Sequence, residues 1–266
     1  MAIKKINGIN IYYELQGKGD PIIFLSGFST NRETWRNYSD SFSSSNQTLI
    51  LDNRGAGQTD APPPPYSIET MADDTATLMD ELGIKQAHMV GSSMGTAIIQ
   101  TLALRYPEKI KKGILISPFA KLPRTSIMKS ETVAKLLKAN VPLNLVIESV
   151  MPWLYSNAFL NDGEKARIKS EEMQNNPYPQ SPEGYLGQLT ALKSFNISDQ
   201  AQDIQAEMLL IAGGEDLSTP LYCSEFLHEA LPSSTLKVFE HVGHMAHVEK
   251  RDQVFDLIRS FIHKPS

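Results

Sequence analysis

The sequence is poor in cysteine, in long apolar runs and in blocks of like charge. Its 266 residues include a single cysteine, Cys223, which excludes an intramolecular disulfide framework and a cysteine-based zinc cluster. One cysteine also fits a reducing compartment, and the N-terminal segment MAIKKINGIN lacks the apolar stretch of a signal peptide. No run approaches the roughly 18 apolar residues that a membrane span needs. We therefore expect a cytoplasmic protein without a membrane span.

Charged residues are distributed without strong bias. The 25 basic and 30 acidic side chains give a formal net charge of −5, and no block reaches five like charges. A nucleic-acid surface would need clustered lysine and arginine, so we expect no nucleic-acid partner. A chain of this length can bury one sizeable core without disulfides, which favours one domain with an inserted lid. Composition leaves the oligomeric state open between monomer and homodimer.

Short apolar runs alternate with helical patterns along most of the chain. After an N-terminal hairpin turning at Asn7-Gly8, continuous apolar runs ending at turn residues are typical of strands buried on both faces. The runs lie at 21–27, 48–52, 87–91, 113–117, 208–213 and 236–240, and helical patterns lie at 31–43, 67–82, 94–105, 221–230 and 248–262. This alternation predicts an α/β fold with a mostly parallel, twisted sheet and helices on both faces.

The alternation breaks once, between Ser117 and Met208. About ninety residues separate these strands, far more than the dozen or so that a single crossover needs. Helical patterns lie at 125–139, 142–150, 162–173 and 182–194. We interpret residues 119–198 as an all-helical cap, or lid, inserted into a core made of residues 1–118 and 199–266.

The strongest chemical signal is Gly91-Ser92-Ser93-Met94-Gly95, which follows a predicted strand and opens a predicted helix. In a G-x-S-x-G turn, small residues two positions either side let the chain turn sharply and expose the central hydroxyl. Only Ser93 has glycines at both positions. Because serine alone is a weak nucleophile, it needs a base and an orienting carboxylate.

In α/β folds with this serine turn, the acid and then the base follow the nucleophile along the chain. Asp216 follows a late strand and is our choice of acid, with Glu215 as the alternative. The base is expected after the last strand, in His241-Val242-Gly243-His244-Met245-Ala246-His247. We choose His244, because Gly243 allows close approach to the nucleophile, and interpret His241 and His247 as structural.

Acyl transfer also requires donors for the developing oxyanion. The amide of Met94 is one, and the amide of Phe28, after Gly27, is the expected second. The Asp52–Gly57 loop lacks the residues of a phosphate-binding motif, so we interpret Arg54 as a residue that fixes this loop. We expect neither a metal nor an organic cofactor.

The segments SGF, DNRGAGQTD, GSSMG, GGEDLSTP and VGHMAHVEK appear in the order found in the α/β-hydrolase superfamily, which the chain resembles over nearly its whole length. The resemblance implies Ser93 as nucleophile, Asp216 as acid, His244 as base and a helical cap. The chain looks most like small bacterial esterases and members similar to 3-oxoadipate enol-lactonase or aminoacrylate hydrolase. It departs from many members at Ser26, Ser92 and Thr96, which bears on substrate.

The lid carries several apolar side chains that predict a largely apolar cleft above the sheet. We expect a pocket lined by Gly27, Phe119, Trp153 and Leu217. This favours a serine hydrolase acting on a small or medium, uncharged carboxylic ester or lactone. Arg124 or Lys121 could still reach a substrate carboxylate, so a lactone that carries an acid group stays an alternative. The alternatives are a carbon–carbon bond hydrolase, an acyltransferase or a cofactor-free perhydrolase using the same triad, or a slow-turnover ligand receptor.

Overall fold

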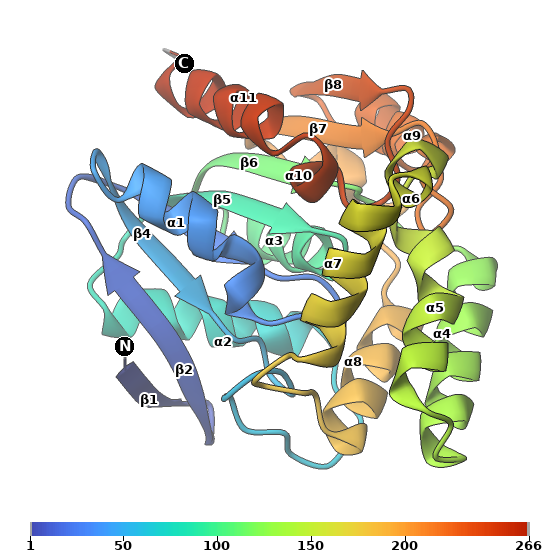
Figure 1. Cartoon of the computed structure of the whole chain (residues 1–266). Coiled ribbons are helices and arrows are strands. Elements are labelled where there is room, and N and C mark those ends of the chain that lie inside the picture. The colour runs from blue at the N-terminus through green and yellow to red at the C-terminus, as the bar shows by residue number, and fades with distance from the viewer. Residues whose placement is uncertain (1, 265–266) are drawn as a thin grey trace.

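The computed structural model describes residues 2–264 and contains a mixed sheet of eight strands in the order β1-β2-β4-β3-β5-β6-β7-β8 (Figure 1). The N-terminal strands β1 and β2 form an antiparallel hairpin, and β2 pairs antiparallel with β4. All other neighbouring strands are parallel. The strands are β1 (Ala2–Ile6), β2 (Ile9–Gln16), β3 (Asp20–Leu25), β4 (Asn46–Leu51), β5 (Ala87–Ser92), β6 (Ile110–Ile116), β7 (Glu207–Gly213) and β8 (Ser234–Phe239).

Side chains that alternate along the central strands separate two apolar cores. Along β3, Ile23 and Leu25 join the larger core, whereas Ile22 and Phe24 join the smaller one on the other face. Because both faces are buried, these strands are mostly apolar, as the sequence predicted, although β5 contains the buried His88. The larger core is covered by α2 (Ile68–Glu81), α3 (Met94–Arg105) and α9 (Leu221–Ala230), and the smaller by α1 (Arg36–Phe42) and α11 (Arg251–His263).

The helices of the core begin and end close to the predicted positions. Ser67 caps α2 by accepting a hydrogen bond from the Thr70 amide, and α3 and α9 have the predicted bounds. Two predicted helices are each split in the structure. A 3₁₀ turn η1 (Arg32–Trp35) precedes α1, and a short α10 (Ala246–Glu249) precedes α11. Two further 3₁₀ turns are η2 (Pro107–Lys109) and η3 (Ala201–Asp203).

Between β6 and β7 the chain forms five helices and no strand of the sheet. Figure 1 shows them gathered beyond the carboxyl ends of the central strands. The two ends of the segment meet, since the Ile197 amide donates to the Ala120 carbonyl at 3.0 Å. The helices are α4 (Arg124–Lys138), α5 (Leu143–Leu154), α6 (Asn157–Asn161), α7 (Gly163–Gln174) and α8 (Pro182–Ser194).

This helical insertion differs from the sequence prediction in two places. The helix α5 continues past Pro152 to Leu154, and α6 was not predicted. Proline usually ends or kinks a helix because it lacks an amide hydrogen, but this helix continues for two residues beyond Pro152. The short α6 begins at a side-chain cap, since Ser156 accepts a hydrogen bond from the Phe159 amide at 3.2 Å.

None of the helices within residues 2–264 is long and apolar enough to cross a membrane. Over the same residues, no group of three or more histidine, cysteine, aspartate or glutamate side chains has an arrangement that could hold a metal ion.

Candidate active site

Ser93 lies in a sharp turn between β5 and α3, with φ 50° and ψ −116°. A non-glycine residue in this region of backbone space costs about 1–3 kcal/mol and persists only where the surroundings enforce it. Here the enforcement is close packing, since a Cβ on Gly95 would lie 2.2 Å from the Leu25 carbonyl oxygen and one on Gly91 would lie 2.8 Å from the Gly95 carbonyl carbon. The turn leaves Ser93 partly exposed at the carboxyl edge of the sheet, while its neighbour Ser92 is buried.

Asp216 and His244 form a buried hydrogen-bonded pair. The distance between Asp216 Oδ2 and His244 Nδ1 is 2.7 Å. The other carboxylate oxygen accepts hydrogen bonds from the amides of Ser218 at 2.7 Å and Thr219 at 2.8 Å, and the Thr219 hydroxyl donates to Oδ2 at 2.9 Å. With Nδ1 held by the carboxylate, the other imidazole nitrogen, Nε2, is free to accept a proton from a substrate or a nucleophile.

Backbone contacts bring the pair to the same end of the sheet as Ser93. The Ser93 amide donates to the Ile116 carbonyl at 2.9 Å, and the next residue, Ser117, donates through its hydroxyl to the His244 carbonyl at 2.7 Å. The Thr219 hydroxyl lies 3.1 Å from the Ser117 carbonyl oxygen. The loops after β5, β6 and β7 and the His244 loop therefore converge around Ser117. In the described part of the chain, the Ser93 hydroxyl and the His244 ring are not hydrogen-bonded to each other.

The alternatives to Asp216 and His244 have other contacts. Glu215 accepts a hydrogen bond from the Asn157 amide at 2.9 Å, so it caps α6 of the insertion, and lies 3.5 Å from His241 Nδ1. The His241 side chain is 82% exposed. His241 lies two residues beyond Phe239, the last residue of β8. His247 is buried in α10, and its ring stacks on Trp35.

The two expected oxyanion donors lie on either side of Ser93, the expected nucleophile. Met94 is the first residue of α3, so its amide has no acceptor within its own helix. A Cβ on Gly27 would lie 3.5 Å from Ser93 Cβ, which places the loop after β3 directly beside the nucleophile. Across residues 2–264, neither the Phe28 nor the Met94 amide has a hydrogen-bond acceptor. Both amides are thus available to a bound oxygen atom.

The helical insertion contacts each of the loops that carry these groups. The Phe28 ring packs against Tyr185 of α8, with 4.6 Å between ring centroids. The Ser218 hydroxyl, two residues after Asp216, donates to the Trp153 carbonyl at 2.8 Å. Next to His244, the Met245 amide donates to the Leu154 carbonyl at 3.0 Å. The insertion therefore covers the loops of Phe28, Asp216 and His244, which we name the oxyanion, acid and base loops after their expected roles.

The residues expected to line the substrate pocket have different environments. Gly27 lies beside Ser93, Trp153 lies over the acid loop, and the neighbouring Leu217 is 52% exposed. Phe119, in contrast, is fully buried and packs edge-on against Phe195, with 5.8 Å between ring centroids. Phe119 belongs to the larger core, so its packing there is its evident role.

Arg54 and Gln188 connect the insertion with the loop after β4. As expected, Arg54 fixes its loop, because its guanidinium donates two hydrogen bonds of 2.9 Å to the buried Asp74 carboxylate. Gln188, on α8, donates to the Arg54 carbonyl at 3.0 Å and accepts from the Ser29 amide at 3.1 Å. Sequence reasoning missed Gln188, whose partners lie 134 and 159 residues away.

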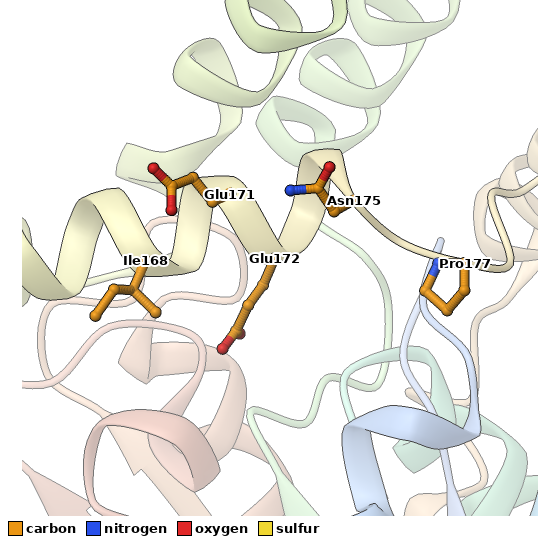
Figure 2. Close-up of a pocket in the computed structure, with 5 residues that line it drawn as sticks. All are labelled: Ile168, Glu171, Glu172, Asn175 and Pro177. Carbon is orange, nitrogen blue, oxygen red and sulfur yellow. The ribbon is translucent and has the colours of Figure 1, made fainter.

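Two surface hollows lie away from these groups. One, of about 420 Å³, runs along α7 and is lined by Ile168, Glu171, Glu172, Asn175 and Pro177 (Figure 2). The other, of about 400 Å³, is lined by residues that include His88 and Asp20, near the amino ends of the central strands. Neither contains Ser93, Asp216 or His244.

Glu249 is a further positioning residue that the sequence did not reveal. Its carboxylate accepts hydrogen bonds from the Gly243 amide at 3.0 Å, the Ser156 amide at 3.0 Å and the Ser156 hydroxyl at 2.6 Å. A Cβ on Gly243 would lie 2.7 Å from the Ser156 amide nitrogen, so this glycine allows close approach to the insertion, whereas we had expected approach to the nucleophile. Glu249 thus joins the loop of His244 to the insertion.

We predict that Glu249→Gln lowers kcat/KM about tenfold and the free energy of unfolding by about 1–3 kcal/mol. The reason is that one carboxylate oxygen, which accepts hydrogen bonds, is replaced by an amide NH₂ group that faces the donors of Gly243 and Ser156. Urea unfolding and steady-state turnover measure the two effects. Glu229→Gln, an exposed substitution on α9, is the control and should change neither. A Glu249→Gln variant indistinguishable from that control would contradict the positioning role.

His247 lies under the site in an apolar environment. Its ring stacks on Trp35 with 4.9 Å between centroids, and within residues 2–264 neither ring nitrogen has a hydrogen-bond partner. Burial, aided by the charges of His244 and Lys169, lowers the pKa of His247 from 6.5 to about 3. The folded protein therefore holds this ring neutral, while the unfolded chain protonates it below pH 6.5.

This pKa shift predicts acid sensitivity. The stability that comes from the neutral His247 is fully present above pH 6.5 and is lost as the pH falls toward 3. At pH 4.5 the loss is about 2–3 kcal/mol. Urea unfolding gives the free energy of unfolding at pH 7 and at pH 4.5. The decrease between these two pH values should be smaller by about this amount in His247→Gln than in wild type. The exposed His241→Gln control should keep the wild-type difference, and a His247→Gln variant that also keeps it would contradict the prediction.

A model of the alpha/beta hydrolase fold family matches residues 20–251. With this match, the chain belongs to the alpha/beta hydrolase fold family, as its sequence motifs suggested. The eight-stranded sheet, the serine turn after β5 and the helices on both faces agree with that assignment.

Relatives with assigned names are similar over most of the chain. The 3-oxoadipate enol-lactonase 2 of Acinetobacter baylyi is 28% identical over 244 residues, covering 91% of this chain and 89% of the relative. A Caulobacter protein named "Putative carbamate hydrolase RutD" is 27% identical over 244 residues, covering 88% of each chain. The crystal structure of the enol-lactonase from Burkholderia xenovorans LB400 has a TM-score of 0.88 at 22% identity, covering 99% of this chain and 100% of that one, which supports the fold alone.

Proposed function

We propose that this protein is a serine hydrolase that cleaves small or medium carboxylic esters or lactones through an acyl-enzyme intermediate. The observation that carries the proposal is the 2.7 Å hydrogen bond between Asp216 and His244, held at the same sheet edge as the strained turn of Ser93. An imidazole oriented by a carboxylate, at the same sheet edge as a serine hydroxyl, is the arrangement that can activate a serine nucleophile.

In the proposed reaction, His244 Nε2 accepts the Ser93 proton as the hydroxyl oxygen attacks the substrate carbonyl carbon. The amides of Phe28 and Met94 donate to the resulting oxyanion, and Asp216 stabilises the protonated imidazole. His244 then gives the proton to the leaving alcohol, and the acyl group stays on Ser93. A water molecule, deprotonated by the same imidazole, releases the acid and restores the serine. Apart from this water and the substrate, every reacting group belongs to this chain.

We further propose that residues 119–198 act as a cap over a core made of residues 1–118 and 199–266. The contacts of this segment with the oxyanion, acid and base loops support this division. Gly27, Trp153 and Leu217 would then border the substrate, with Phe119 packed behind them. A cytoplasmic location, and a monomer or homodimer, remain predictions.

The direct test uses phenyl esters of graded acyl length, simple lactones and a fluorophosphonate probe. We expect turnover of about 1 s⁻¹ or more on at least one substrate, within the usual enzyme range. We also expect the probe to label one site, which peptide mass spectrometry should assign to Ser93. Labelling elsewhere, or no turnover across the whole panel, would count against the proposal.

Carbamate cleavage is a second candidate, because the Caulobacter relative is named as a carbamate hydrolase. Attack on a carbamate carbonyl uses the same nucleophile, base and oxyanion donors, so the triad does not separate the two functions. Comparing a phenyl ester with the phenyl carbamate of matched size separates them. Product analysis with added alcohol or peroxide likewise separates hydrolysis from acyl transfer and perhydrolysis.

A further inference from the structure

One face of α4 is directed toward the loop that carries Asp216. Ser126, Ser130 and Val133 recur at helical spacing and are all buried. The Ser126 hydroxyl donates to the carbonyl of Ser218, which lies two residues after Asp216. Lys129 lies three residues after Ser126, so its side chain leaves the same face of the helix. A lysine is therefore placed on an otherwise buried surface against the acid loop.

The Lys129 side chain packs against the second segment that contacts this loop. Its Nζ atom lies 5.6 Å from the centroid of the Trp153 ring, and the Trp153 carbonyl accepts the hydrogen bond from the Ser218 hydroxyl. An ammonium group over an aromatic face is weakly attracted to it. The aromatic ring does not neutralise the charge, so Lys129 remains a cation held between α4, α5 and the acid loop.

Several other basic residues of the insertion have carboxylate partners, and those that lack one are exposed to solvent. Lys165 is 2.8 Å from Asp162, Lys193 is 2.7 Å from Glu131, and Arg124 is 3.5 Å from the same Glu131. For Lys129, no carboxylate of residues 2–264 lies within 4.0 Å, and its amine makes no hydrogen bond there. Burying an unpaired charge is unfavourable, so such a group points to a partner supplied by a ligand.

The charge of Lys129 agrees with this interpretation. Burial lowers the pKa of Lys129 to about 8, and the negative charge of Asp216 opposes that shift. The amine therefore remains mostly protonated near pH 7.

We propose that Lys129 forms a subsite for a carboxylate carried by the substrate, so that the preferred substrates are esters or lactones of acids with a second carboxylate. This inference rests on the proposed hydrolase function and revises our expectation of an uncharged substrate. A single ammonium without a neighbouring arginine fits a monoanionic carboxylate better than a phosphate dianion. Arg124, which the sequence had suggested for this role, is 66% exposed and paired with Glu131.

The test compares phenyl hemiglutarate, which carries a free carboxylate, with phenyl glutaramate, its neutral amide of the same length. We expect wild type to prefer the carboxylate ester in kcat/KM by about tenfold, a preference that weakens in high salt. Lys129→Met should reduce the ratio to about one, and Lys129→Arg should retain part of it. Lys135→Met, an exposed change on the same helix, should keep the wild-type ratio.

The outcomes separate this inference from the proposed function. Turnover of both esters with equal ratios in wild type and Lys129→Met would overturn the subsite and leave the hydrolase assignment intact. An equal loss on both esters in Lys129→Met would show that the lysine acts on the triad, which also overturns the subsite. If neither ester is turned over, the proposed function fails. The subsite is then tested separately by measuring the binding of glutarate by calorimetry. Weaker glutarate binding in Lys129→Met than in Lys135→Met supports it, and equal binding contradicts it.

Discussion

Ser93→Ala is expected to lower kcat on the best ester of the panel by roughly 10⁴- to 10⁶-fold and to abolish fluorophosphonate labelling. The hydroxyl oxygen is the atom that forms the acyl bond, and the fold offers no substitute at its position. Ser92 cannot replace it, because that residue is buried within β5, one position before the turn. Residual activity would come from the oxyanion amides and from substrate binding alone.

The substitution leaves the fold intact, which makes the result easy to interpret. Alanine has the same Cβ as serine and tolerates φ 50° equally poorly, so the strain of the turn is unchanged. Urea unfolding should therefore give nearly the wild-type free energy. Ser92→Ala is the matched control, and its turnover should stay within about threefold of wild type. A folded Ser93→Ala protein that still reacts with the probe would refute the assignment of the nucleophile.

The core of this fold was predictable because its signals are local. Each central strand is a short, mostly apolar run, and burial on both faces explains why apolar residues follow one another without the alternation of a half-exposed strand. The turn at Ser93 was predictable for the same reason. The backbone must pass close to Leu25, only glycine fits at Gly95, and that requirement is visible in five consecutive residues.

The chain order of the superfamily also pointed to Asp216 and His244, which the structure joins. The choice between Asp216 and Glu215 was harder to predict, because the local sequence does not show which of two adjacent carboxylates faces the histidine. The structure separates them by direction. Asp216 points inward to His244 and to the amides of its own loop, whereas Glu215 points to the Asn157 amide of the insertion.

Contacts between the insertion and the core could not be predicted, because they join residues far apart in the sequence. Glu249 and Ser156 are 93 residues apart, and Gln188 and Ser29 are 159 residues apart. Lys129 was missed for the same reason. On sequence alone it is one lysine among several on a polar helix, and only the docking of α4 on the acid loop sets it apart.

Asp216→Asn is expected to lower kcat/KM by roughly 10⁴-fold while leaving the fold in place. In the protein, Oδ1 accepts from the amides of Ser218 and Thr219, and Oδ2 faces His244 Nδ1. The two backbone amides require an acceptor, so the asparagine carbonyl would take the Oδ1 position. The amide nitrogen of the new side chain would then lie against Nδ1 and donate to it.

That reversal has a chemical consequence. If Nδ1 becomes the acceptor, the neutral imidazole carries its hydrogen on Nε2 and cannot take the proton of Ser93. The nucleophile is still present, so the loss should lie in kcat, and the fluorophosphonate reaction should slow by a similar factor. Glu215→Gln is the matched control one residue away, and it should remain within about fivefold of wild type. If Glu215→Gln proves more damaging than Asp216→Asn, the orienting acid is Glu215, and the 2.7 Å hydrogen bond between Asp216 and His244 is structural only.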